Sequence, residues 1–164
     1  MEKFKRIRPR NWLYESFVVI EVLIIITICC LLIKPLLYGL IVGSWLYLVL
    51  ANVLRGIFLK HHKRGIKQMG NRHFTEAIDA FSLSHDFFEK HKGIDKYRFL
   101  TMFMSSKLSY RQMALFNLAN CYAAKSQFNE AKEKLEQFLQ TAPPDEATQE
   151  ALAIVTKIDD ELKN

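Results

Sequence analysis

Two long apolar runs, separated only by Lys34 and Pro35, dominate the first third of the chain. The first run covers residues 17–33 and the second covers 36–56. Each is close to the ~20 residues that a helix needs to cross a bilayer. Proline lacks an amide hydrogen and disfavours helical geometry in the residue before it. The pattern therefore predicts a transmembrane helical hairpin over 17–59, with its turn at 34–35. A re-entrant wedge that does not reach the far side of the membrane is the alternative.

From residue 60 onward the apolar positions recur at helical spacing, and glycine and proline are scarce. No alternating strand pattern occurs in this part of the sequence, so the periodicity predicts helices throughout. Pro143 and Pro144 end one helix, and residues 145–163 form an amphipathic helix that would cap an open-ended stack. The predicted fold class is all-α, with the hairpin followed by one helical domain over 60–164.

The helical domain contains a repeated segment. Phe-x-Glu-Ala begins at Phe74 and again at Phe128, 54 residues later. Around the second copy, the apolar and small positions and the final proline resemble the tetratricopeptide repeat (TPR) family: Leu115, Leu118, Ala119, Tyr122, Ala131, Leu135 and Pro143. The first copy supplies Gly65, Ala77, Phe81 and Ser84, although His61 replaces the family's first apolar residue, and Phe138 stands where the family prefers a small one.

This resemblance implies a right-handed stack of antiparallel helices, with repeat one at about 60–90 and repeat two at about 110–142. It also implies a groove, lined by the first helix of each repeat, that binds a protein partner. The matching positions in the second copy are Met113, Phe116, Asn117, Asn120 and Ala124. Asn120 matches an asparagine that family members use to hold a peptide backbone or carboxylate. The basic partners of a carboxylate clamp are not recognisable here.

The two copies are about 20 residues further apart than adjacent repeats of ~34 residues would be. The extra residues form an inserted arm at about 93–106, which loosely resembles arms in membrane-tethered TPR-like bacterial proteins. Its apolar side is larger than a solvated connector needs: Tyr97, Phe99, Leu100, Met102, Phe103 and Met104. We expect the arm to pack against the repeats, and a contact with a partner or the membrane is the alternative.

Positive charge is concentrated beside the apolar runs. Residues 1–72 carry 12 lysines and arginines and 3 acids, whereas residues 73–164 carry 11 and 14. The hairpin is flanked by basic residues at both ends, namely by the segment 1–16 before it and by the residues after position 59. The positive-inside rule then places the N-terminus and the helical domain in the cytoplasm, and we expect a two-pass protein of the bacterial inner membrane. Basic flanks attract anionic lipid headgroups, whereas a nucleic-acid partner would require a basic patch on the folded domain.

Several residues inside the hairpin are unusual for a membrane segment. Glu21, Asn52 and Arg55 lie at similar distances from the turn by helical rise, so we expect a structural polar cluster, with an ion or proton path as the alternative. Gly39 and Gly43 have the GxxxG spacing of closely packed helices. They indicate packing within the hairpin, or else a homo-oligomer. Trp45 and Tyr47 lie too deep for an interfacial belt, and we expect them to face protein.

The sequence offers little for catalysis. No metal-binding motif accompanies the five histidines, and no phosphate-binding loop or nucleophile motif is present. We therefore expect no enzyme activity, cofactor or metal. The predicted function is a membrane-anchored scaffold that recruits or helps assemble a protein partner, in particular a membrane complex. The alternative is a structural subunit in which the hairpin itself is the working part.

Overall fold

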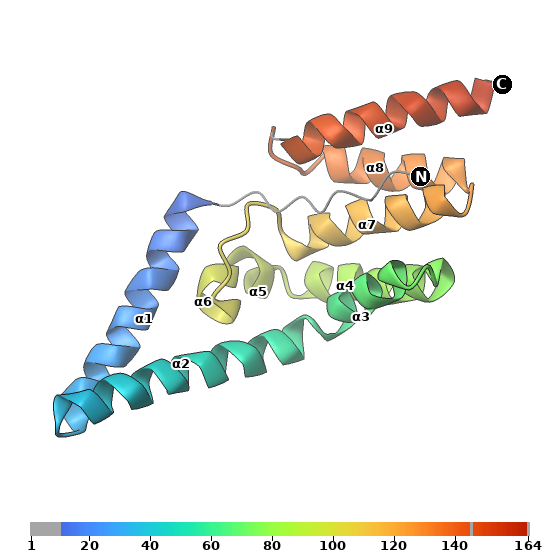
Figure 1. Ribbon diagram of the computed structural model, residues 1–164. Coiled ribbons are helices and arrows are strands. Elements are labelled where there is room, and N and C mark those ends of the chain that lie inside the picture. Colours follow the sequence, from blue (N-terminus) through green and yellow to red (C-terminus); the bar gives the residue numbers. More distant parts are fainter. Residues whose placement is uncertain (1–10, 145, 164) are drawn as a thin grey trace. The chain divides into compact units, whose positions relative to one another are not determined.

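The computed structural model describes residues 11–144 and 146–163 (Figure 1). Residues 1–10 of the predicted basic segment 1–16, and Asp145, the first residue of the predicted capping helix, lie outside the described residues. The described residues form helices and no strand, which confirms the all-α fold class. The helices are α1 (Trp12–Leu32), α2 (Leu36–Phe58), α3 (Lys60–Gly70), α4 (Phe74–Lys90), α5 (Lys92–Lys96), α6 (Arg98–Met102), α7 (Tyr110–Ala124), α8 (Phe128–Leu139) and α9 (Glu146–Lys163).

The chain forms two compact units. The hairpin unit contains residues 11–60 and 96–106, and the bundle unit contains 61–95 together with the described residues from 107 onward. The sequence-based division at residue 60 therefore needs a correction. Most of the inserted arm belongs with the hairpin and not with the helical domain, because its contacts are made with α1 and α2.

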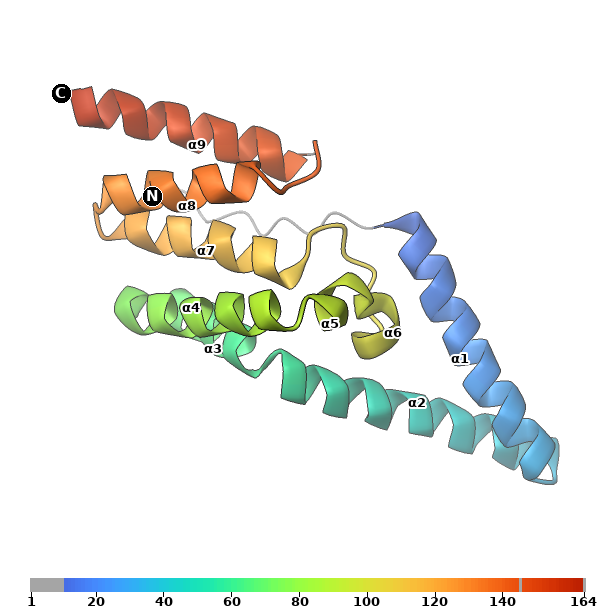
Figure 2. The same cartoon turned by 180° about the vertical axis from the view of Figure 1, so that it is seen from behind.

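Helices α1 and α2 are joined by a turn at residues 33–35 and diverge from it (Figures 1 and 2). Close to the turn, Gly39 and Gly43 are buried against α1. A methyl group on Gly39 would lie 2.6 Å from the Cα of Cys30, and one on Gly43 would lie 2.9 Å from the Cα of Ile26. The glycines therefore permit close backbone approach within the hairpin.

The 96–106 segment fills the space between the diverging ends of α1 and α2 (Figures 1 and 2). The Phe99 ring stacks on Tyr14 and Phe17 of α1, with ring centroids 5.1 and 5.0 Å away. On the other side, the Phe103 ring meets the edge of Tyr47 of α2 at 5.1 Å. Aromatic contacts thus connect the segment to both helices.

The bundle unit layers its helices in the order α4, α7, α8 and α9 (Figures 1 and 2). Helix α3 packs on α4, where Gly65 leaves room for the Phe81 ring. The largest core cluster joins α7, α8 and α9 through side chains that are at least nine-tenths buried: Leu115, Phe116, Ala119, Ala131, Leu135, Phe138, Ala147, Ala151 and Ile158. Burial of these apolar side chains stabilises the stack, and α9 closes one side of it.

The helix pairs α3–α4 and α7–α8 share the same turn. Arg72 and Ser126, 54 positions apart like the repeated sequence, both adopt left-handed backbone, with φ of 62° and 58°. The amide of His73 donates to the Gln68 carbonyl at 3.0 Å. Gln127 repeats this bond to the Tyr122 carbonyl at 2.9 Å. Both first helices therefore end in the same Schellman-type motif, so the sequence repeat is also a backbone repeat.

Candidate functional site

The five predicted groove residues all lie on α7, but the structure does not expose them alike. Ala124 is exposed, and Met113 and Asn117 are half-buried. Phe116 is buried in the α7–α9 core, with its ring centroid 5.5 Å from that of Phe138. It therefore contributes to packing and does not line an open groove, because α8 and α9 cover that side of α7.

Asn120 is the most informative of the five residues. The residue is 7% exposed, and the described structure records no hydrogen bond for its side chain, but its amide atoms are not among the buried polar atoms that lack a partner. The amide can both donate and accept a hydrogen bond. A peptide backbone bound here would take the place of water at this amide.

The start of α7 is fixed by several hydrogen bonds. The Ser109 hydroxyl accepts from the Gln112 amide at 3.1 Å, and the Gln112 side chain accepts from the Ser109 amide at 2.8 Å, which completes a capping box. The buried carboxylate of Asp95 accepts from the amides of Tyr110 and Arg111 at 2.8 and 3.0 Å. The Ser-x-x-Gln signal is visible in the sequence, but the contribution of Asp95 is not, because 15 residues separate it from Tyr110.

A charged cluster lies on the surface of the bundle unit. Glu89 pairs with Arg111 at 2.5 Å and with Lys92 at 2.6 Å. The hydrogen bond from Arg111, followed by that from Lys92, lowers the pKa of Glu89 to about 2. The carboxylate is therefore ionised and paired at neutral pH. It connects α4 to α7.

The predicted polar cluster of the hairpin does not form. Arg55 donates from Nε to the Met102 carbonyl at 2.8 Å and from a terminal nitrogen to the Phe103 carbonyl at 2.6 Å. Asn52 donates to the Leu48 carbonyl of its own helix at 2.8 Å. One carboxylate oxygen of Glu21 is buried without a hydrogen-bond partner. The sequence missed the partner of Arg55 because it lies 47 residues further along the chain.

The two deep aromatic residues of α2 also differ from each other. Tyr47 contacts Phe103, so the expectation that it faces protein is confirmed. Trp45 is 66% exposed, and for this residue the expectation was wrong. Neighbouring positions such as 45 and 47 point about 200° apart on a helix, so one packed face cannot cover both.

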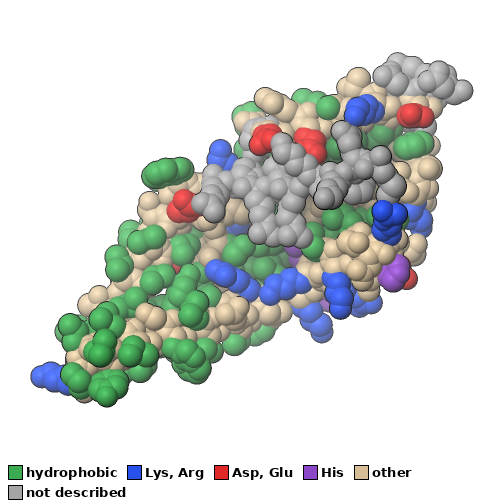
Figure 3. Space-filling model, in the orientation of Figure 1, with side chains coloured by type: hydrophobic (Ala, Val, Ile, Leu, Met, Phe, Trp, Pro, Cys, Tyr) green, Lys and Arg blue, Asp and Glu red, His purple; other side chains and the backbone are tan. Residues whose placement is uncertain are grey.

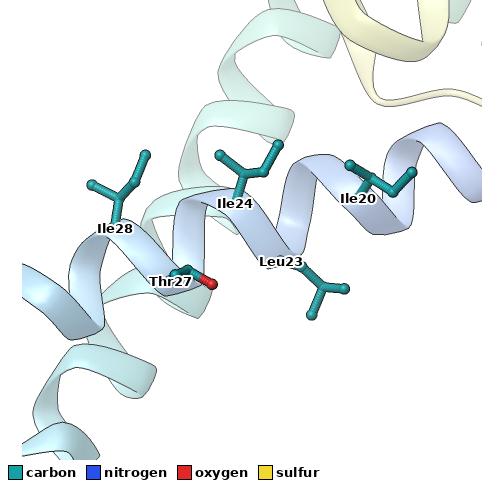
Figure 4. Close-up of a pocket in the computed structure, with 5 residues that line it drawn as sticks. All are labelled: Ile20, Leu23, Ile24, Thr27 and Ile28. Atoms are coloured by element: carbon teal, nitrogen blue, oxygen red, sulfur yellow. The ribbon is translucent and has the colours of Figure 1, made fainter.

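A shallow apolar hollow runs along the outer face of α1. It is lined by Ile20, Leu23, Ile24, Thr27 and Ile28. Ile20, Ile24 and Ile28 form one row and Leu23 and Thr27 a second (Figure 4). Apart from the Thr27 hydroxyl the lining has no polar group, so it lacks the convergent polar groups of a small-molecule site.

The described residues contain no group of three or more histidine, cysteine or acidic side chains placed to hold a metal ion. His62 is buried and takes part in packing, with its ring beside those of Phe81 and Tyr110. Burial raises the pKa of the Cys121 thiol to about 12, so this cysteine is an inert core residue.

Comparison of the chain with protein-family models, curated proteins and solved structures gave no match. The TPR resemblance, with its groove and right-handed stack, therefore stays a prediction. The functional argument depends on the residues themselves.

Proposed function

We propose that this protein is a membrane-anchored, TPR-like scaffold that holds a helical domain at the cytoplasmic face and recruits a protein partner there. The observation that carries the anchor is the exposure of apolar side chains. Among the described residues, all but four of the exposed large apolar side chains lie on α1 and α2 (Figure 3), the four being Leu83, Tyr97, Leu100 and Leu152. A soluble protein rarely exposes a continuous apolar surface of this extent.

Helices α1 and α2 are 21 and 23 residues long, and both are long and apolar enough to cross a membrane. Only 6% and 17% of their most apolar windows are buried, whereas the core helix of a soluble protein would be mostly buried. The basic residues of α3, together with Arg72, follow α2 directly and favour a cytoplasmic bundle unit. These observations support an integral membrane protein.

The scaffold role is supported by the repeated helix pairs and by the amide of Asn120 on α7, for which the described structure records no hydrogen bond within the fold. Helix pairs that stack through a shared core present an extended surface to a partner. The surrounding residues, Met113 and Asn117, are partly accessible and offer both apolar and amide contacts.

The experiment compares partner recovery between two leucine variants. Wild-type protein is purified from native membranes in mild detergent, and stoichiometric partners are identified by crosslinking and mass spectrometry. Asn120→Leu should lose the partner while keeping its thermal stability, because the described structure records no hydrogen bond for the lost amide. Asn129→Leu, at an exposed position on α8, is the matched control. A lone monomer, or equal recovery with both variants, contradicts the scaffold.

A structural role of the hairpin is the second candidate, favoured by its shape. Helices α1 and α2 are in contact near the turn and diverge toward the 96–106 segment (Figure 1), so the hairpin unit is wider at its open end. Such a unit would displace more lipid in one leaflet than in the other. The test replaces the outward apolar residues with those of an unrelated hairpin but keeps the inward contacts of Tyr14, Phe17, Tyr47 and Arg55. Scaffolding should survive this exchange, whereas a structural role should not.

A further inference from the structure

The 96–106 segment has one side that faces the hairpin and another that is exposed among the described residues. Its inward residues, Met102 and Phe103, are 0% and 7% exposed. Tyr97 and Leu100, three positions apart and hence on one helical face, are 48% and 57% exposed. Outside α1 and α2, these two side chains account for half of the exposed large apolar residues described above.

The segment is held firmly to the beginning of α1. The Asn11 amide donates to the Ser105 carbonyl at 2.8 Å. The guanidinium of Arg98 lies over the Tyr14 ring, 5.0 Å from its centroid, and also donates to the Ser106 carbonyl at 3.0 Å. Arg98 is itself 5% exposed. The outward side of the segment is therefore presented by a fixed surface and not by a loose loop.

The 96–106 segment contacts α1 at a position that corresponds to one face of a bilayer. Tyr14 precedes the turn at Lys34 by 20 residues, which is ~30 Å along a helix. This length matches the thickness of the hydrocarbon core. If the turn lies at one headgroup level, the residues that contact Tyr14 lie near the opposite headgroup level. Where the helices tilt, these residues lie slightly deeper, within the leaflet on that side.

The exposed residues beside the 96–106 segment are of the types that favour the headgroup level of a membrane. Trp12 and Leu13, just before Tyr14, are 83% and 70% exposed. The Lys96 ammonium lies 5.4 Å from the centre of the Tyr97 ring. Tryptophan and tyrosine are enriched at membrane interfaces, and lysine reaches from an apolar surface to the headgroups. The 96–106 segment and the hairpin belong to the same compact unit.

We propose that the 96–106 segment is a third membrane-contacting element, which inserts Tyr97 and Leu100 into the interfacial layer of the phospholipid bilayer and places Lys96 among the headgroup phosphates. The proposal rests on the proposed membrane anchor. It adds that residues from the middle of the chain, and not the terminal hairpin alone, bind lipid. The bound chemistry is a phospholipid headgroup with its first acyl carbons.

The test places a photoreactive benzoylphenylalanine at one position at a time in the full chain, reconstituted in phosphatidylcholine–phosphatidylglycerol vesicles. Leu100 is the test position. Leu152, 51% exposed on α9, is the matched control for an exposed leucine outside the hairpin unit, and Ile28 on α1 reports on the anchor. After illumination, lipid adducts are measured by mass spectrometry of the intact protein.

We expect lipid adducts at Leu100 and Ile28, with at least a tenfold lower yield at Leu152. Adducts at Ile28 but not at Leu100 would overturn this inference and leave the anchor intact. Crosslinks from Leu100 to a second copy of the chain would overturn it as well. Absence of adducts at Ile28 would instead contradict the proposed anchor. Because Leu100 is exposed, the substitution leaves the packing of Met102 and Phe103 in place.

Discussion

Replacing Arg55 with methionine should release the 96–106 segment from the hairpin. Arg55 of α2 makes two hydrogen bonds to this segment, to the carbonyls of Met102 and Phe103. Methionine keeps much of the apolar stem of arginine but removes every donor. The variant therefore tests the hydrogen bonds with little change in packing.

The magnitude follows from the two bonds. A hydrogen bond to a charged group contributes ~1.5–3 kcal/mol, and a buried carbonyl left unpaired costs ~1–3 kcal/mol. Water can replace part of this where it reaches the carbonyls, so we take the lower end and expect a loss of ~2 kcal/mol. Because ~1.4 kcal/mol corresponds to a factor of ten, the segment should open about 30-fold more often.

Hydrogen exchange measured by mass spectrometry in detergent micelles provides the assay. The amides of Leu100, Thr101 and Met104 are bonded within the segment, so its opening should speed their exchange about 30-fold. Exchange in α8 and α9 should not change. Arg64→Met removes an exposed arginine for which the described structure records no polar contact, and it should behave like wild type. Equal exchange of wild type and Arg55→Met in residues 96–106 would refute the reasoning.

Three further predictions concern packing, backbone strain and pH. Gly39→Ala should destabilise the hairpin by ~1–3 kcal/mol, as measured by SDS titration in mixed micelles. Gly56→Ala, with open space around the glycine, should leave the stability unchanged. A change in oligomeric state without loss of hairpin stability would instead indicate packing between copies. Ser126→Gly should raise the stability of the bundle unit by up to ~1 kcal/mol in chemical denaturation, because glycine adopts the left-handed backbone at no steric cost, and a loss of stability would contradict this explanation. Glu89→Gln should lower the stability by ~0.2–1 kcal/mol at pH 7, as expected for a surface ion pair. Because the pKa of Glu89 in the folded protein is lowered from 4.5 to about 2, the stability difference between wild type and variant should be full above pH 4.5 and fade as the pH falls toward 2. A difference that persists at pH 2 would have another cause.

The sequence predicted the features that depend on local patterns. The apolar runs and Lys34-Pro35 predicted the two hairpin helices and their turn, and the predicted 17–33 and 36–56 compare with Trp12–Leu32 and Leu36–Phe58. Helix α1 begins earlier because the Asn11 side chain accepts a hydrogen bond from the Leu13 amide and caps it. Local apolar periodicity and capping thus determine most of the boundaries of these two helices.

Contacts between distant parts of the chain could not be predicted in this way. The apolar side of the inserted arm indicated a packed surface, but the sequence pattern does not say which surface covers it. The partner of Arg55 is a pair of backbone carbonyls, which have no residue-type signal. Phe116 was placed in a groove by its position in the repeat, yet the capping helix and α8 bury it. Side-chain spacing predicts a helical face, whereas tertiary packing decides what that face contacts.

The interleaved course of the chain has a practical consequence for obtaining a water-soluble version of the protein. A fragment that starts at Lys60 would retain residues 96–106 without the hairpin that covers Phe99 and Phe103, so it should aggregate. Asp95 binds the Tyr110 amide at 2.8 Å, so the two ends of the excursion are already held together. Excising 96–106 as well, and joining Asp95 to Lys107 by a short flexible linker, should therefore yield a soluble helical bundle.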